Sequence, residues 1–76
     1  MNAIIEKKIS QNIRALREKT GMTQETLATK LQLAGCDITR SSVAKIEVGQ
    51  RHLYPDEIYL IKKILNVSFD EIFDIK

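Results

Sequence analysis

The hydrophobic residues of this chain recur at intervals of three and four positions, which is the period of an amphipathic α-helix. Near the start, four of them are spaced by four, four and three residues: Ile5, Ile9, Ile13 and Leu16. This stripe predicts a first helix from about Ile5 to Thr20. Gly21 follows at the place where a helix commonly ends in a left-handed residue.

Capping residues and the same spacing predict four more helices. Thr23 and Thr39 suit the N-cap position, Pro55 suits a first helical turn, and Ser68 with Glu71 forms a capping-box pattern. The expected ranges are Gln24 to Ala34, Arg40 to Val48, Pro55 to Leu65, and a short last turn from Ser68 to Phe73. No stretch alternates for long with the two-residue period of a strand. We therefore predict an all-α fold of five short helices, organised as a single domain over residues 1–76.

The hydrophobic positions of these helices also predict the core. The residues expected to face inward are Leu27, Ala28, Leu31 and Ala34 in the second helix, Val43 and Ile46 in the third, Ile58, Ile61, Ile64 and Leu65 in the fourth, and Ile72 in the last turn. Because Val43 and Ile46 turn inward, Arg40, Ser41 and Lys45 lie on the outward side of the third helix. Several hydrophobic residues near the termini either pack against the core or belong to a dimer surface: Ile4, Ile5, Phe69, Phe73 and Ile75.

The second and third predicted helices carry a recognisable motif. It reads Thr23-Gln24-Glu25-Thr26-Leu27-Ala28-x-x-Leu31, then Thr39-Arg40-Ser41-Ser42-Val43-Ala44-Lys45-Ile46-Glu47-x-Gly49-x-Arg51. This pattern resembles the Cro/cI-type helix-turn-helix family of Xre-like regulators. The resemblance extends from Ile9 to Phe73, with the motif itself at about residues 23–49. It implies a compact five-helix, lambda-repressor-like DNA-binding domain.

The resemblance also assigns roles to individual positions. The base-reading positions of the family fall on Arg40, Ser41 and Lys45, where the third helix would enter a major groove about 12 Å wide. The positions that contact the DNA backbone, or lie beside it, fall on Gln24, Ser42, Gln50, Arg51 and His52. Arg17 and Glu47 repeat a family ion pair, which we expect to lock the first helix to the third.

The sequence departs from the family pattern between the two helices of the motif. The link from Leu31 to Glu47 is five residues longer than is usual, and the extra residues fall within Gln32–Ile38. We expect a longer second helix and a longer turn, with Ile38 reaching the core and both helix faces retained. Asp37 then places an acidic group near the presumed path of the DNA phosphates.

The charges of the chain are unevenly distributed, although the net charge of 76 residues is only +2. Residues 1–53 hold nine Lys and Arg against five Asp and Glu, whereas residues 54–76 hold three against five. A basic first part with an acidic tail is what a polyanion-binding protein shows. An imbalance of this size also arises by chance, so charge alone does not identify a partner.

Length and cysteine content argue against several classes of protein. A chain this short buries only about 60% of the surface of its unfolded form, which leaves no room for a deep catalytic cleft or an effector domain. Cys36 is the only cysteine and His52 the only histidine, so we expect neither a disulfide nor a metal site. No segment suits a signal peptide or a membrane span. We therefore expect a cytoplasmic protein without cofactor or membrane partner.

Together these inferences predict sequence-specific binding of double-stranded DNA by a bacterial or phage transcriptional regulator. Repression is favoured over activation, with a homodimer on a palindromic operator and no small-molecule effector. The alternative is an adaptor or antitoxin-like module whose main partner is another protein, and hydrophobic termini would favour it if they prove exposed. No feature of the sequence supports an enzymatic activity.

Overall fold

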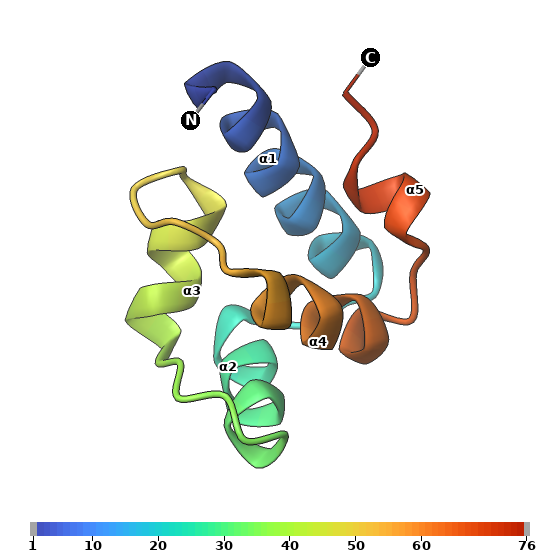
Figure 1. The fold of residues 1–76 in the computed structure, drawn as a ribbon. Coiled ribbons are helices and arrows are strands. Elements are labelled where there is room, and N and C mark those ends of the chain that lie inside the picture. Colours follow the sequence, from blue (N-terminus) through green and yellow to red (C-terminus); the bar gives the residue numbers. More distant parts are fainter. Residues whose placement is uncertain (1, 76) are drawn as a thin grey trace.

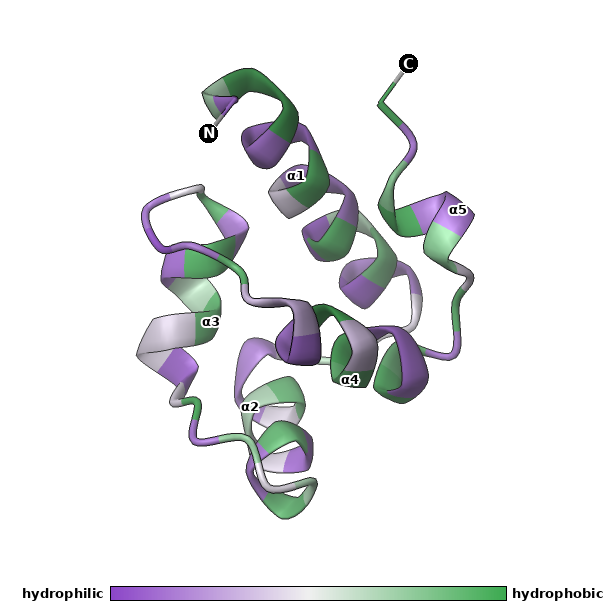
Figure 2. Ribbon diagram, viewed as in Figure 1, coloured by the Kyte–Doolittle hydropathy of each residue, from purple (hydrophilic) through white to green (hydrophobic). Residues whose placement is uncertain are grey.

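The computed structural model describes residues 2–75, which form five α-helices joined by short connections (Figure 1). The helices are α1 (Ala3–Lys19), α2 (Gln24–Leu33), α3 (Arg40–Glu47), α4 (Pro55–Leu65) and α5 (Phe69–Ile72). No strand occurs among these residues, so the predicted all-α fold is confirmed. Hydrophobic and hydrophilic positions succeed each other along the helices, as amphipathic helices require (Figure 2).

The helices begin close to where the capping residues predict. The first residues of α2, α3 and α4 are the predicted ones. In contrast, α1 begins at Ala3, two residues before the expected Ile5. The side-chain oxygen of Asn2 accepts hydrogen bonds from the backbone N–H groups of Ile4 and Ile5, each at 3.1 Å, and caps the helix there. The hydrophobic stripe starts later than this cap and does not reveal it.

Two helices organise the core. Helix α2 packs against α3 and α4, and α1 packs against α3 and α5. Its buried hydrophobic residues are Ile13, Leu27, Ala28, Leu31, Cys36, Ile38, Val43, Ile46, Ile61, Leu65 and Ile72. All except Cys36 are residues that the sequence predicts to face inward. Ile9, Leu16, Ile58 and Ile64 pack against this cluster but are only partly buried. The removal of these side chains from water is the main force that holds the helices together.

Ala34, which we expected to pack inward, is exposed. So are the hydrophobic residues that we expected either to pack against the core or to form a dimer surface: Ile4, Ile5, Phe69, Phe73 and Ile75. Ala34 is the C-cap of α2, which ends at Leu33, so its side chain lies in the turn. Phe73 follows the end of α5, where Ile72 alone is buried. Ile5 lies in the first turn of α1, which projects beyond α3 and α4 (Figure 1).

The longer link between α2 and α3 folds back onto the core. The N–H of Cys36 donates to the carbonyl of Leu31 at 2.9 Å, and the side-chain amide of Gln32 donates to the carbonyl of Ile38 at 2.6 Å. Ile38 is fully buried, which confirms its predicted position. Cys36 is also buried, and burial raises the pKa of its thiol, so the thiol stays protonated at neutral pH.

Candidate nucleic-acid interface

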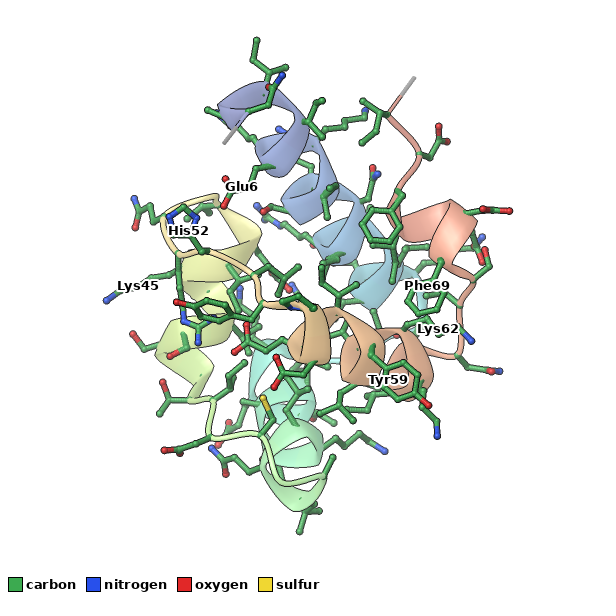
Figure 3. The ribbon with its side chains drawn as sticks, viewed as in Figure 1. Glu6, Lys45, His52, Tyr59, Lys62 and Phe69 are labelled. Carbon is green, nitrogen blue, oxygen red and sulfur yellow. The ribbon has the colours of Figure 1, made fainter. Side chains whose placement is uncertain are left out.

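The outward side of α3 carries polar side chains that the rest of the molecule does not use. Val43 and Ile46 hold the opposite side of the helix against the core. Arg40, Ser41 and Lys45 are exposed, and Lys45 points away from the helices (Figure 3). None of these three side chains has a hydrogen bond or ion pair within residues 2–75. We call Arg40, Ser41 and Lys45, which the family resemblance assigns to base reading, the reading face.

The start of α3 is held in place by its N-cap. Thr39 Oγ1 accepts a hydrogen bond from the backbone N–H of Ser42 at 3.1 Å, and the two hydroxyl oxygens also lie 3.1 Å apart. The Ser42 hydroxyl is therefore engaged with the cap, although it lies beside the reading face. This cap fixes the direction in which Arg40 and Ser41 leave the helix, since both lie in its first turn.

A buried charged network connects the end of α3 to α1 and α2. Arg17 donates to the Glu47 carboxylate through Nε at 2.6 Å and through Nη2 at 3.0 Å, and its Nη1 donates to the carbonyl of Met22 at 2.7 Å. The Arg17 and Glu47 side chains are only 9% and 1% exposed. The hydrogen bonds to Glu47 raise the pKa of Arg17. The structure thus brings together the two residues that the sequence pairs, and they join α1 to α3 and to Met22, just before α2.

The loop after α3, residues 48–54, contains Arg51, whose guanidinium is already occupied. Arg51 Nη1 and Nη2 donate to the two carboxylate oxygens of Glu57, each at 2.9 Å. Glu57 Oε1 also accepts the backbone N–H of Tyr54 at 3.0 Å. Burial opposes the ionisation of Glu57, but the hydrogen bonds from Arg51 and Tyr54 outweigh it and lower its pKa. Arg51 therefore holds the loop to α4.

The other basic side chain of this loop reaches α1. His52 Nδ1 lies 2.7 Å from Glu6 Oε1, and the two side chains meet between the loop and the start of α1 (Figure 3). The neighbouring Gln50 is exposed, and its backbone N–H donates to the carbonyl of Lys45 at 2.8 Å. Two of the predicted backbone-contacting residues, Arg51 and His52, thus have carboxylate partners within the chain.

The packing of α2 against α3, with a fixed start of α3 and an unpaired polar face beyond it, is the geometry of a helix-turn-helix. A family model described as helix-turn-helix matches residues 13–72, well over half of the chain. The chain belongs to the Cro/cI-type helix-turn-helix family. It is accordingly a DNA-binding protein of the transcription-regulator type. No curated protein matches the chain.

In this helix-turn-helix protein, the start of α2 opens onto a polar groove. Gln24 is the first residue of α2, and its Nε2 donates to Glu47 Oε1 at 3.0 Å. An amide nitrogen has two N–H groups, so one remains for an acceptor outside the protein. Arg14 and Arg40 line the same groove. The free N–H groups of a first helical turn add further attraction for an anion.

Three charged residues with contacts at or beside this interface were not among the predicted site residues: Arg14 and Glu6 on α1, and the buried Glu57 on α4. Arg14 lies three positions before Arg17, a spacing that places both on neighbouring parts of one helix face. Glu57 is the third residue of α4, a position from which a glutamate side chain can accept the N-cap backbone N–H, here that of Tyr54. Both signals are present in the sequence. Glu6 has no such signal, because its partner His52 is 46 positions away.

Residues 2–75 lack two further features. No helix in this part of the chain is long and apolar enough to cross a membrane. The same residues contain no group of three or more His, Cys, Asp or Glu side chains arranged to hold a metal ion.

Proposed function

We propose that the protein binds specific sequences of double-stranded DNA by placing α3 in the major groove. The observation that supports this proposal most directly is the reading face: Arg40, Ser41 and Lys45 are exposed, lie opposite the buried side of α3, and have no partner within residues 2–75. A major groove offers hydrogen-bonding partners to such side chains. Family membership supplies the general activity, and these residues supply the proposed contacts.

Each side chain of the reading face has a distinct proposed role. Arg40 donates two parallel hydrogen bonds to O6 and N7 of a guanine, which is the most discriminating of these contacts. Ser41 donates to or accepts from a base edge, and Lys45 contacts a base or an adjacent phosphate. Four further residues are proposed to meet the DNA backbone or lie beside it: Gln24, Ser42, Gln50 and His52. Arg14 joins them because it lines the groove at the start of α2.

Arg51 is proposed to contact the backbone with its charge partly neutralised. Its guanidinium forms a bidentate pair with Glu57, so only part of its positive charge is available to a phosphate. Backbone contacts of this kind position the protein on DNA without reading its sequence. Substitution of Arg51 should therefore weaken binding to all sequences alike.

We also propose that two copies bind one palindromic operator and repress by occupying it, without a small-molecule effector. A single reading face offers few base contacts, and two recognition helices about 34 Å apart would reach successive major grooves. The proposed dimer surface is on α5, where Phe69 and Phe73 stack with ring centroids 6.3 Å apart and are both partly exposed. Lys62 lies over the Phe69 ring at 5.4 Å (Figure 3).

Selection of duplexes from a random pool, followed by footprinting of the enriched sequences, tests this function. We expect a palindrome with half-sites one helical turn apart, and binding that weakens about 10³- to 10⁵-fold between 50 and 200 mM salt. The variant Phe73→Ser should convert this footprint to a single half-site while leaving the half-site sequence unchanged. Enrichment of no sequence would overturn specific DNA binding, and a non-palindromic site would overturn the dimer.

The alternative function, an adaptor or antitoxin-like module that binds a protein, is favoured by one observation. Ile4 is 81% exposed at the start of α1, and Ile75, near the other end of the chain, is partly exposed. Exposed hydrophobic side chains of this size mark protein interfaces when they gather in a patch. Binding through such a surface should barely respond to salt, so the salt titration separates the two functions.

A further inference from the structure

We propose that Asp37, in the longer link between α2 and α3, selects cytosine at one base pair of the operator. Its carboxylate would accept a hydrogen bond from the cytosine N4 amino group in the major groove. This inference rests on the proposed DNA binding by α3 and concerns a residue outside the reading face. The same charge would weaken binding to DNA that lacks the preferred base, because phosphates repel it.

The first support is that the backbone around Asp37 is fixed. The residues on either side, Cys36 and Ile38, are both buried, whereas Asp37 is exposed. The N–H of Ile38 donates to the carbonyl of Cys36 at 2.9 Å, so the chain turns tightly at Asp37. The hydrogen bond from Gln32 to the Ile38 carbonyl ties this turn to α2. The backbone of Asp37 is therefore held in place, and its exposed side chain leaves the link from a fixed point.

The second support is the place of this turn beside α3. Asp37 is two residues before the N-cap Thr39 and three before Arg40, and the link runs directly into the start of α3 (Figure 1). This is the end of α3 that is proposed to enter the groove. No acidic residue lies in the first turn of α3. Asp37 thus adds one negative charge to the edge of a positively charged surface.

The third support is that no group within residues 2–75 pairs with the Asp37 carboxylate. An ionised carboxylate has no hydrogen-bond donor and can only accept, and the same holds for phosphate oxygens. The major groove offers donors at two places, the N4 amino group of cytosine and the N6 amino group of adenine, and Asp and Glu pair characteristically with the former. Guanine and thymine present acceptors or a methyl group in that groove.

The test compares base preferences of four proteins on one duplex. The duplex enriched by the wild-type protein is changed to each of the other bases at every position, and equilibrium binding is measured for wild type, Asp37→Ala, Asp37→Asn and Asp56→Asn. Asp56 is exposed at the start of α4 and serves as the charge-matched control. Thermal unfolding of each variant is measured in parallel.

We expect wild type to prefer cytosine at one position by about five-fold or more. Asp37→Ala should lose this preference and bind random-sequence duplex more tightly. Asp37→Asn should move the preference to adenine, with which Asn pairs through N6 and N7. Asp56→Asn should keep the cytosine preference.

Three outcomes would overturn this inference, and they can be told apart. If Asp37→Ala retains every base preference of the wild-type protein within two-fold, Asp37 does not read DNA, and the proposed function of α3 still stands. If the wild-type protein enriches no sequence at all, the proposed function fails and this inference fails with it. A loss of preference that accompanies a large drop in the unfolding temperature of Asp37→Ala, with no shift to adenine in Asp37→Asn, would also overturn the reading role.

Discussion

The family resemblance assigns three basic residues to DNA: Arg40 and Lys45 on α3, and Arg51 in the loop after α3. Their surroundings in the structure differ. Arg40 and Lys45 are exposed without partners among residues 2–75. Arg51 donates two hydrogen bonds to the Glu57 carboxylate, through Nη1 and Nη2. In the sequence these side chains are equivalent cations. In the structure, the two α3 cations have no partner within residues 2–75, whereas Arg51 pairs with Glu57 and holds the loop to α4.

This difference separates two requirements of a DNA-binding surface. A base-reading side chain needs free hydrogen-bond donors, since it must exchange water for a base edge. A loop that follows the backbone needs a defined shape, because phosphate contacts set the register of the protein on the duplex. The unpaired reading face meets the first requirement, and the paired loop meets the second.

The largest loss of stability should come from breaking the buried ion pair between Arg17 and Glu47. Glu47→Gln leaves the Arg17 guanidinium buried without a counter-charge, which should lower the free energy of unfolding by about 3–5 kcal/mol. Urea unfolding at neutral pH measures this loss. The control is Glu18→Gln, because Glu18 pairs with Arg14 at 3.8 Å and the two side chains are 56% and 54% exposed. Equal losses of stability in the two variants would show that the buried Arg17–Glu47 pair stabilises the fold no more than the exposed Arg14–Glu18 pair.

A smaller loss of stability should follow from opening the loop. Glu57→Gln removes the carboxylate that binds Arg51, whose side chain is 28% exposed, and should cost about 1–3 kcal/mol at pH 7. The folded-state pKa of Glu57 lies below its ordinary value of 4.5, so this stabilisation is complete above that value and is lost as pH falls through the folded-state pKa.

The pH dependence gives this prediction its control. Urea unfolding of the wild-type protein and Glu57→Gln is compared at pH 7 and pH 3, and the difference in stability between them should shrink in acid. Glu71, whose pKa is lowered by a hydrogen bond from the Ser68 backbone N–H, is present in both proteins and cancels in the comparison. A difference that stays constant with pH would mean that the Glu57 charge does not stabilise the loop.

On the DNA side, Arg40→Ala should change specificity more than affinity for random sequence. Loss of the bidentate contact to guanine should reduce discrimination at one base pair by about 1–3 kcal/mol. Binding to single-base variants of the selected duplex measures this value at each position. Arg51→Ala is the matched control, because it removes the same type of side chain from the loop. If Arg51→Ala relaxes the same base pair, the assignment of reading and positioning residues is wrong.

The sequence predicts most of this fold because its signals are local. The caps Thr23 and Thr39 define where α2 and α3 begin, and the buried Ile38 shows that hydrophobic spacing survives the longer link. Local signals place helix ends less accurately than helix starts. Helix α2 stops one residue before the predicted end, and this leaves Ala34 exposed. The engagement of His52 by Glu6 cannot be predicted in this way, because no local rule connects residues 46 positions apart.

The smallest expected effect is a change in the salt dependence of DNA binding, which should differ between Lys45 and Arg51. A phosphate contact contributes about one unit to the slope of log affinity against log salt concentration, so Lys45→Ala should reduce the slope by about one if Lys45 meets a phosphate. Arg51→Ala should reduce it by less, because Glu57 already neutralises much of the charge. Binding of wild type and both variants to one duplex over a salt series measures these slopes. A larger change for Arg51→Ala than for Lys45→Ala would mean that DNA draws the Arg51 guanidinium away from Glu57, and that the loop charge is as available as that of α3.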